Sequence, residues 1–318
     1  MEKINWGILG YARIAKNSVI PAVMEASTAN LYGIASRVED KREEAMGLFP
    51  FEKAYETYEA LLEDENIQAV YIPLPNALHK EWAMKAMVKG KHVLCEKPLA
   101  LTEEEVREMK KVSEREGVLL MEAFMYRYTD RMTKVMEILD SGILGEIRHV
   151  ESSFRFFLNR PNTIKMKKEL GGGALYDVGC YPVSFAGLIL KEEPMSIAVS
   201  SVLEEGVDIE TSIFLTYRRG VTASLHCGFN AYGVNHSEIL GTKGRLVIPD
   251  TFLDVEGSIT LHHDDQVESL HVPGCHRYTL EVEDFSKAVL EHRKPLVTIE
   301  ESLLQARVMD RILEKIHK

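Results

Sequence analysis

The sequence has few cysteines, and nothing in their spacing joins them. They are scattered along 318 residues without a CxxC pair and stand at Cys95, Cys180, Cys227 and Cys275. Two neighbouring pairs, His226-Cys227 and Cys275-His276, each resemble half of a metal site, but no second pair of ligands follows at a zinc-site spacing. We therefore expect free, buried thiols in a reducing compartment and no metal centre.

Basic charge and long apolar runs are also lacking. The formal net charge is -11, which excludes a general nucleic-acid binder because such a protein needs a basic surface. No apolar run approaches the roughly 20 residues of a membrane-spanning helix. The N-terminus, 1–6, runs directly into a predicted strand and has no signal-peptide pattern. These absences predict a cytoplasmic protein that acts on neither nucleic acid nor membranes.

The first part of the chain alternates short apolar strands with helices. Strands are predicted at 4–9, 31–35, 69–72, 92–95 and 118–121, and helices at 13–26, 58–62, 79–88 and 102–116. Regular alternation of this kind is typical of a doubly wound parallel sheet. We predict a Rossmann-type α/β domain over residues 1–122, since 318 residues are too many for a single core.

The second part, 123–318, has a different pattern. After a helix at 129–139 come long β-rich segments separated by turns such as Arg219-Gly220 and Lys243-Gly244, and two helices close the chain at 278–291 and 300–316. This predicts an α+β domain with a mostly antiparallel sheet covered by helices on one face. We place Phe154, Phe156 and Tyr217 on the open face, and an exposed apolar sheet face predicts a homodimer interface.

The turn after the first strand has the spacing of a dinucleotide fingerprint. Gly10 stands at the first glycine position, while Ala12 and Ala15 replace the second and third. Small residues there let the backbone approach a pyrophosphate at a helix N-terminus. The methyl group of Ala12 takes some of that room, so an ordinary strand–helix turn is the alternative.

The end of the second strand distinguishes the two nicotinamide cofactors. An NAD site usually has an acid there for the ribose diol, but this chain has Ser36-Arg37, followed by Lys41. Hydroxyl and guanidinium groups suit a 2′-phosphate, so we predict NADP rather than NAD. A surface loop is the alternative, and Glu39 or Asp40 could still reach a ribose.

Two further loops follow predicted strands of this sheet. The strand 92–95 ends in Glu96-Lys97-Pro98, and the strand 69–72 ends in the loop Pro73 to His79. In an open parallel sheet, chemistry lies beyond the carboxyl ends of the strands. A lysine held there can bind a substrate oxygen. His79 opens a helix, so a cap or a surface position is the alternative to a catalytic base.

A glycine-rich turn in the second domain leads into an apolar helix. It consists of 171–173 and is followed by Asp177 and Tyr181, which lie on one helical face because they are four residues apart. A tyrosine hydroxyl can exchange a proton with an alcohol or carbonyl, and a nearby lysine lowers its free pKa near 10. The carboxylate of Asp177 can bind a substrate hydroxyl. A packed tyrosine after an ordinary turn is the alternative.

Together these motifs resemble the Gfo/Idh/MocA oxidoreductase family over essentially the whole chain. The matching segments are 69–79 (AVYIPLPNALH), 96–98 (EKP), 122–127 (EAFMYR) and 171–181 (GGGALYDVGCY). The chain looks closest to the branch holding dimeric dihydrodiol dehydrogenase, NADP-dependent D-xylose dehydrogenase and glucose–fructose oxidoreductase. That branch commonly has the Gly-x-Ala-Arg-Ile-Ala turn, so Ala12 fits it.

The resemblance implies roles for individual residues. It implies Lys97 and Tyr181 as the catalytic pair, with Asp177 on the substrate and Arg127 as a further substrate contact. Other pocket candidates are Tyr126, Phe157, Asn159 and Arg160. The residues expected to line the cofactor are Gly10, Tyr11, Ala12, Arg13, Ile14, Ser36, Arg37, Lys41, Pro73, Leu74, Asn76, His79, Glu96 and Lys97.

We therefore predict an NADP(H)-dependent dehydrogenase. It would transfer a hydride between the cofactor and the CH–OH or C=O group of a sugar, polyol or related cyclic alcohol. Two alternatives stay open: a non-catalytic, cofactor-binding regulator on the same scaffold, and a reductase of a dicarbonyl or imine substrate.

Overall fold

The computed structural model describes residues 2–159 and 163–316, which form two compact units. Unit 1 consists of residues 1–125 and 276–302, and unit 2 consists of residues 126–275 and 303–318. The predicted boundary after residue 122 lies close to the end of the first segment. A single boundary assigns residues 276–302 to the second domain. In the structure they belong to unit 1, because a late helix packs on the first sheet.

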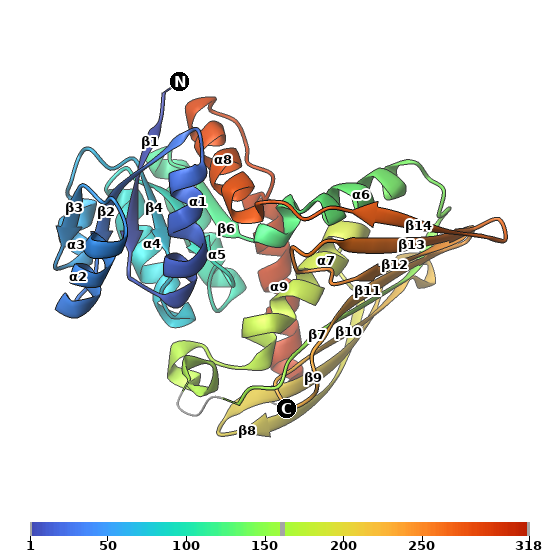
Figure 1. The fold of residues 1–318 in the computed structure, drawn as a ribbon. Coiled ribbons are helices and arrows are strands. Elements are labelled where there is room, and N and C mark those ends of the chain that lie inside the picture. The colour runs from blue at the N-terminus through green and yellow to red at the C-terminus, as the bar shows by residue number, and fades with distance from the viewer. Residues whose placement is uncertain (1, 160–162, 317–318) are drawn as a thin grey trace. The chain divides into compact units, whose positions relative to one another are not determined.

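Unit 1 is built on a parallel sheet whose strands, within the described residues, stand in the order β3-β2-β1-β4-β5-β6 (Figure 1). Every strand pair in it is parallel. The strands are β1 Ile4–Leu9, β2 Ala29–Ala35, β3 Lys53–Tyr55, β4 Ala69–Ile72, β5 His92–Glu96 and β6 Leu120–Ala123. Because the strand order reverses between β1 and β4, the sheet is doubly wound, which confirms the predicted Rossmann-type fold.

Helices cover both faces of this sheet. They are α1 Ile20–Glu25, α2 Glu39–Leu48, α3 Tyr58–Leu62, α4 His79–Val88, α5 Glu103–Glu116 and α8 Arg277–Leu290. Adjacent residues of β1 show the two faces: the Trp6 indole donates to the Ser286 hydroxyl of α8 at 3.1 Å, whereas a side chain on Gly7 would collide with Leu61 of α3. The late helix α8 therefore belongs to the core of unit 1, beside α1 (Figure 1).

Local signals explain where two of these helices begin and end. The π-helical turn Ala15–Val19 leads into α1 directly before Pro21, whose missing N–H cannot continue a regular α-helical ladder. Helix α5 begins after Thr102, whose hydroxyl accepts a bond from the Glu105 amide, and it ends at Gly117 in the left-handed conformation.

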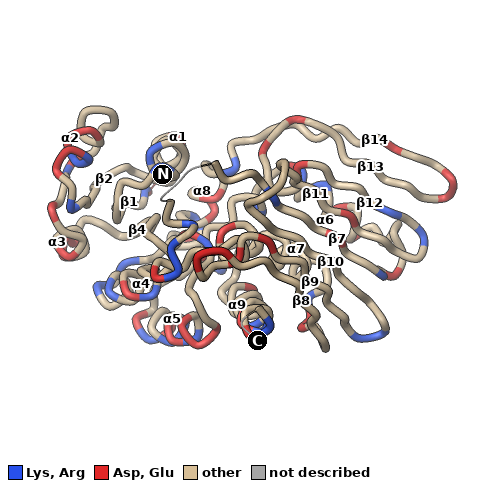
Figure 2. The backbone as a smooth tube through the Cα atoms, turned by 90° about the horizontal axis from the view of Figure 1, so that it is seen from below, with Lys and Arg blue, Asp and Glu red and all other residues tan. Residues whose placement is uncertain are grey.

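Charge on the helices of unit 1 is mixed in sign. Figure 2 shows acidic and basic residues along α2, α4 and α5. Pairs such as Lys85–Glu81 and Arg107–Glu103 join residues four apart on the helix surface. These pairs of opposite charge lie on solvated helix surfaces.

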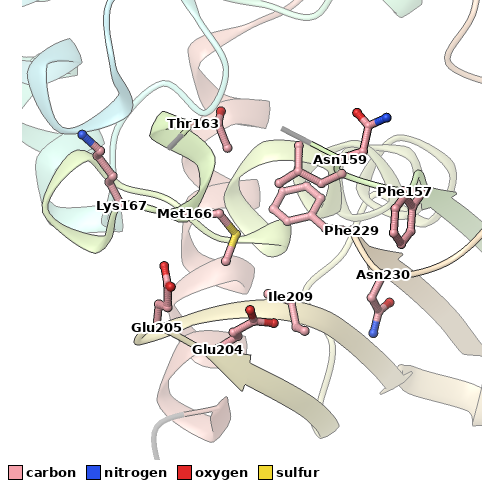
Figure 3. Close-up of a pocket in the computed structure, with 11 residues that line it drawn as sticks. Phe157, Asn159, Thr163, Met166, Lys167, Glu204, Glu205, Ile209, Phe229 and Asn230 are labelled. Carbon is pink, nitrogen blue, oxygen red and sulfur yellow. The ribbon is translucent and has the colours of Figure 1, made fainter. Parts of the chain in front are cut away.

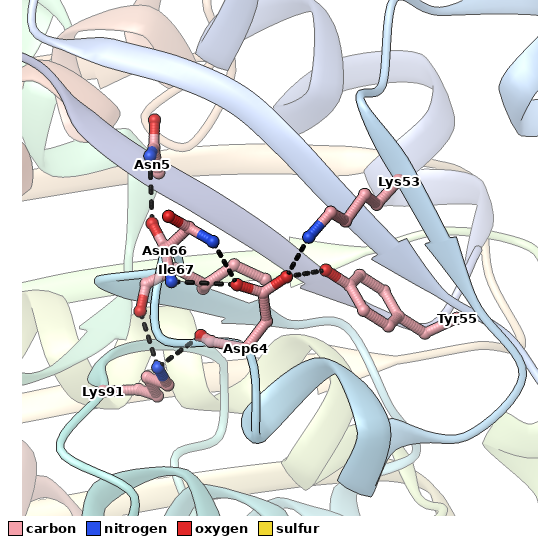
Figure 4. Close-up of polar contacts among 7 residues, drawn as sticks. All are labelled: Asn5, Lys53, Tyr55, Asp64, Asn66, Ile67 and Lys91. Atoms are coloured by element: carbon pink, nitrogen blue, oxygen red, sulfur yellow. Dashed lines mark hydrogen bonds and ion pairs between the residues drawn. The ribbon is translucent and has the colours of Figure 1, made fainter.

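The amino-terminal edge of the parallel sheet is held by a polar network around Asp64 (Figure 4). The Asp64 carboxylate accepts bonds from Lys53 at 2.7 Å and Tyr55 at 2.6 Å, and from both nitrogens of Asn66. Hydrogen bonds from Lys53 and then Tyr55 hold the pKa of the Asp64 carboxyl well below its usual range. Buried Lys91 donates to the carbonyls of Asp64 and Ile67, so this edge is closed by structural contacts.

Unit 2 contains the second sheet, ordered β14-β13-β12-β11-β7-β10-β9-β8 in the described residues (Figure 1). Only β7 and β10 pair in parallel among its described strands, which confirms a mostly antiparallel sheet. The strands are β7 Ile147–Arg155, β8 Ser196–Glu204, β9 Val207–Thr216, β10 Thr222–Gly228, β11 Val234–Gly241, β12 Gly244–Pro249, β13 Gly257–His263 and β14 Gln266–Val272. The helices are α6 Asp130–Asp140, α7 Cys180–Leu190 and α9 Ile299–Ile316, of which α9 begins in unit 1.

One face of this sheet packs against α7. The aromatic residues that we predicted on the other, open face are in fact packed inside the structure. The Phe154 ring lies 5.3 Å from the Tyr181 ring and 5.6 Å from the Phe252 ring, on the helix-covered side. Tyr217 is only 3% exposed, and Phe156 packs on Phe229. The predicted exposure of Phe154 was wrong because β7 enters the sheet with Val150, Ser152 and Phe154 facing inward. Tyr217, which follows β9, is buried as well.

The stretch Lys168–Leu190 is long and apolar enough to span a membrane by composition, an exception to the absence inferred from the sequence. Its most apolar window is 67% buried inside the structure, and the backbone turns at Gly171 and Gly173, which both have positive φ. The stretch is therefore core structure of unit 2.

Candidate active site

The carboxyl edge of the first sheet begins at Gly10, directly after β1. Gly10 has a φ of +109°, and a side chain there would meet Leu74 at 3.0 Å, so only glycine fits without strain. The next residue, Tyr11, is 7% exposed, and its buried hydroxyl has no hydrogen-bond partner in the described residues. Helical backbone follows from Arg13, so a helix N-terminus opens behind a tight turn, as a bound pyrophosphate requires.

Ser36 and Arg37 leave β2 at the same edge. Ser36 is 4% exposed, and its carbonyl accepts a bond from Arg42 at 2.7 Å. The Arg37 guanidinium lies 5.0 Å from the Tyr58 ring and 5.7 Å from the Trp82 ring, an arrangement that orients a cation. Lys41 is exposed on α2. The rival acids Glu39 and Asp40 stand in the first turn of α2, where carboxylates stabilise the helix dipole.

The loop from Pro73 to His79 follows β4 and is fixed by His79. This histidine is fully buried, so its predicted alternative as a surface residue was wrong. Its Nδ1 lies 2.8 Å from the Pro98 carbonyl oxygen and its Nε2 lies 2.8 Å from the Leu74 carbonyl oxygen. Burial lowers the pKa of His79, and the charge of Lys97 lowers it further. His79 therefore ties two loops of the edge together.

The turn Glu96-Lys97-Pro98 ends β5 and has supports on both sides. The Lys97–Pro98 peptide is cis. The Tyr71 hydroxyl donates to the Glu96 carboxylate at 2.6 Å, and the Leu99 amide donates to Glu122 at 3.0 Å. Glu122 is 2% exposed, and burial raises its pKa to about 7. Buried groups thus hold the backbone and the neighbours of Lys97.

In unit 2 the glycine-rich turn, residues 171–173, packs closely against the loop that precedes it. A side chain on Gly172 would lie 2.6 Å from the Lys165 carbonyl oxygen, and one on Gly173 would collide with Asp208. The Gly173 amide donates to the Lys165 carbonyl at 2.8 Å. Asp208 accepts bonds from the Leu175 amide and the Thr211 hydroxyl, both at 2.8 Å. Without side chains, these glycines let the loop and the helix start pack together.

Asp177 and Tyr181 project from the π-helical turn Leu175–Gly179 and from α7. Asp177 forms an ion pair with Lys165, whose ammonium lies 5.5 Å from the Phe156 ring centre. Tyr181 is 3% exposed and packs against the rings of Tyr126, Phe154 and Phe252. A carboxylate and a phenol are therefore held on one helix, one by an ion pair and the other by aromatic packing.

The structure brings the predicted residues together in two groups. Residues 10–14, 36–41, 73–79 and 96–97 lie at the carboxyl edge of unit 1, while Arg127, Asp177 and Tyr181 lie in unit 2. Arg127 stands in the 3-10 turn Met125–Tyr128. Arg160 lies outside the described residues. All four cysteines are free, three of them buried and Cys275 partly exposed.

Sequence reasoning missed Lys165, Glu122 and Asp208. Glu122 carried a signal, because it directly follows the buried strand predicted at 118–121, and in β6 it pairs with Cys95, two residues before Lys97. The ion pair of Lys165 with Asp177 depends on how the glycine turn folds the loop back, and no local pattern predicts that contact.

Comparison with known proteins covers both units. A family model described as an oxidoreductase family with an NAD-binding Rossmann fold matches residues 4–124, and the GFO/IDH/MocA C-terminal domain matches residues 132–247. D-xylose 1-dehydrogenase (NADP(+)) 2 of Haloferax volcanii is 38% identical over 97% of this chain and 96% of its own length. Trans-1,2-dihydrobenzene-1,2-diol dehydrogenase of Xenopus laevis is 30% identical over 98% of this chain and 97% of its own length.

A solved structure agrees with these relatives. The 3-ketoreductase KijD10 of Actinomadura kijaniata, in complex with NADP and TDP-benzene, has a TM-score of 0.91 at 33% identity and covers 99% of this chain and 98% of its own. Both domain models and relatives that match along nearly the whole length lead to one conclusion. This chain is an oxidoreductase of the Gfo/Idh/MocA family.

Proposed function

We propose that this protein is an NADP(H)-dependent dehydrogenase of a sugar, polyol or related cyclic alcohol. The observation that carries this proposal is the 38% identity, over nearly the full length, to an NADP-dependent xylose dehydrogenase. Dihydrodiol dehydrogenases and a 3-reductase of a dTDP-linked dideoxyglucose among the relatives are named for the same CH–OH and C=O chemistry. Reduction of a dicarbonyl or imine would use the same scaffold and differ only in substrate.

The carboxyl edge of unit 1 fits the cofactor. Gly10 leaves room for the pyrophosphate, and the buried Tyr11 hydroxyl and the helix start at Arg13 offer donors. Ser36 and the stacked Arg37, with Lys41 nearby, would hold the 2′-phosphate, which favours NADP over NAD. Loop residues Pro73, Leu74 and Asn76 with Glu96 would line the ribose and nicotinamide. When bound, the nicotinamide gives or accepts the hydride at C4.

The protein's own residues would handle the proton and the orientation of the substrate. Tyr181 transfers the hydroxyl proton, and the Lys97 ammonium stabilises negative charge on the reacting oxygen. Asp177, oriented by its ion pair with Lys165, accepts a bond from a neighbouring substrate hydroxyl, and Arg127 provides a further contact. Tyr181 is held by aromatic packing and Asp177 by its ion pair, and precise placement of this kind lowers a reaction barrier.

Substitution of Tyr181 by phenylalanine tests the mechanism. Tyr181→Phe should lose at least about 10²-fold in kcat because the proton carrier is gone, while NADPH still binds. Tyr217→Phe is the matched control, since Tyr217 is also 3% exposed and lies outside the proposed site. Near-normal turnover in Tyr181→Phe would remove this residue from the mechanism. Cofactor binding by the wild type without turnover over a broad substrate panel would indicate a non-catalytic regulator instead.

We also propose a cytoplasmic homodimer that associates through the uncovered sheet face of unit 2. Val202, Phe214 and Val267 are 49%, 46% and 65% exposed on β8, β9 and β14. Exposed apolar side chains on a wide sheet favour an interface. Four free thiols suit a reducing compartment. Sedimentation velocity of wild type and Phe214→Glu would test the dimer, with a monomer expected for the variant.

A further inference from the structure

We infer that Phe252 is a positioning residue for the proposed reaction, because it holds the ring of Tyr181 so that the phenol hydroxyl keeps one direction. This rests on the proposed function, in which Tyr181 transfers the proton. Phe252 follows β12, far from α7 in the sequence, and is 1% exposed. The packing of its ring and the contacts of its backbone carry the inference.

Phe252 lies at the centre of a group of five aromatic rings. Its ring centre lies 5.4 Å from that of Tyr181 and 6.2 Å from that of Phe185, which stands one helical turn further along α7. It lies 5.6 Å from Phe154, nearly parallel to it, and 5.2 Å from Tyr126. Phe154 and Tyr126 also contact the Tyr181 ring, at 5.3 and 5.9 Å. Loss of the Phe252 ring would therefore remove one support of Tyr181 and loosen the two rings beside it.

The backbone around Phe252 is fixed by hydrogen bonds. The Phe252 amide donates to the Asn235 side-chain oxygen at 3.0 Å, and the Asp250 amide donates to the Asn235 carbonyl at 2.8 Å. The Thr251 hydroxyl is buried and donates to the Ile248 carbonyl at 2.8 Å. Asp250 has a φ of +52°, a left-handed conformation that costs free energy for a residue with a side chain. These bonds select one unusual turn, and that turn directs the ring inward.

Two further contacts hold the far end of the same loop. Arg131 of α6 is 3% exposed, and its guanidinium donates to the Val255 carbonyl at 2.8 Å. The Cys275 amide donates to the Asp254 carboxylate at 2.8 Å. The loop is therefore anchored at both ends by groups outside the aromatic cluster. A ring on such a backbone can hold a neighbouring side chain in place.

A separate pocket of unit 2 contains another buried aromatic residue. Phe229 lines this pocket of about 460 Å³, together with the predicted pocket residues Phe157 and Asn159 (Figure 3). Neither Tyr181 nor Phe252 is among the described residues that line it. The Phe252 cluster and this pocket are therefore two different features of unit 2.

The substitution Phe252→Leu tests the inference in two backgrounds. In the wild type it should lower kcat about tenfold with little change in the Kd for NADPH, because the phenol is less precisely placed. In Tyr181→Phe no hydroxyl is left to position, so the same substitution should lower the residual kcat by less than about twofold. A residue with a merely structural role would cost the same factor in both. The assay uses NADP⁺ with the best substrate of an aldose panel that includes D-xylose.

Phe285→Leu is the matched control. Phe285 is also fully buried, but it packs on Trp6 in unit 1. This variant should lose stability and keep kcat. If Phe252→Leu does not fold, Phe252→Met keeps more of the volume and should show a smaller loss, about threefold, with the same dependence on the background.

A second readout needs no substrate. Fluorine NMR of protein labelled with 3-fluorotyrosine identifies the Tyr181 signal as the one missing from Tyr181→Phe. Phe252→Leu should broaden or split that signal, and Phe285→Leu should leave it unchanged. Equal kinetic losses in both backgrounds, or an unchanged signal, would overturn the inference and leave the proposed function standing. A wild type that oxidises no aldose would overturn the proposed function, and the signal would still decide whether Phe252 holds the ring.

Discussion

Strand β5 has a lysine at each end. Lys91 comes directly before it, at the amino-terminal edge of the parallel sheet, and Lys97 comes directly after it, at the carboxyl edge. Lys91 is 5% exposed and donates to two backbone carbonyls, at 2.7 and 2.8 Å. Lys97 is partly exposed, and the buried groups His79 and Glu122 hold the backbone on its C-terminal side.

The two edges therefore use the same residue type in different ways. At the amino-terminal edge, charges are bound by backbone carbonyls and by Asp64, which closes the ends of β4 and β5 (Figure 4). At the carboxyl edge, buried groups fix the loops that carry the charged residues. Position along a strand, more than residue identity, separates a structural lysine from a candidate catalytic one.

The largest expected effect comes from the same substitution at both ends of β5. Lys97→Met should lower kcat/KM about 10³-fold, because the cation near the reacting oxygen is lost, with little change in the free energy of unfolding. Lys91→Met should leave kcat/KM nearly unchanged and destabilise the fold, because two buried carbonyls lose their donor. Steady-state kinetics and urea denaturation of both variants would check the pair. Similar kinetic losses in both would refute the division between the edges.

Asp64→Asn should give the second largest effect, on stability alone. The variant loses charge-assisted bonds from Lys53 and Tyr55, which we expect to destabilise the fold. The lowered folded pKa of Asp64 means that its stabilisation is complete above the unfolded value near 4 and is lost as the pH falls further. The difference in melting temperature between wild type and variant should therefore stay constant from pH 7 to about pH 5 and begin to narrow between pH 5 and pH 3. A gap that stays constant down to pH 3 would contradict the assigned role.

Much of this arrangement follows from local sequence. Short apolar runs predicted β1 and β4, and the capping residue Thr102 with Gly117 predicted α5. Three elements were not predicted. Helix α2 has only one buried residue, so its sequence lacks an apolar period, and β3 is three residues long. Strand β14 pairs after the turn Asp264-Asp265, where both residues have positive φ, and it has little apolar content.

Contacts between distant segments explain the rest. The packing of α8 on Trp6 joins residues 280 apart in sequence. The register of β7 turned Phe154 inward, against the prediction, because one residue of shift exchanges the faces of a strand. In the candidate site, motif spacing predicted Lys97, Asp177 and Tyr181, whereas Lys165 and Glu122 are recognised only by what they touch.

The third prediction concerns cofactor choice at the carboxyl edge. Arg37→Gln should weaken NADPH binding about 30-fold, or about 2 kcal/mol, and leave NADH binding nearly unchanged, because only NADPH carries the 2′-phosphate. Arg42→Gln is a control for the conformation of this loop, since the Arg42 guanidinium donates to the Ser36 carbonyl. Fluorescence titration with both cofactors measures the change. Equal weakening for both cofactors would show that Arg37 supports the adenine or the fold and does not read the phosphate.

The smallest effect concerns Glu122, a structural group at the functional edge. Burial raises its pKa to about 7, so its folded state holds a proton that the unfolded chain, with a value near 4, has released. Stability should therefore fall as the pH rises from 6 to 8, by about 1 kcal/mol from this group. Glu122→Gln keeps an acceptor for the Leu99 amide and should remove that part of the pH dependence.

Urea denaturation of wild type and Glu122→Gln at pH 6, 7 and 8 measures this slope. Glu281 is also buried, and burial raises its pKa well above the usual range, so Glu281→Gln is the appropriate comparison. Because the Glu281 proton is held more tightly, the folded chain keeps it from pH 6 to 8 while the unfolded chain has released it, so Glu281→Gln should flatten the slope more than Glu122→Gln does. An unchanged slope in Glu122→Gln would show that Glu122 is already ionised beside Lys97. The Leu99 amide would then donate to a charged carboxylate. Both edges of the sheet would in that case depend on an ionised acid, Glu122 at one and Asp64 at the other, and the contrast between them would be smaller than stated above.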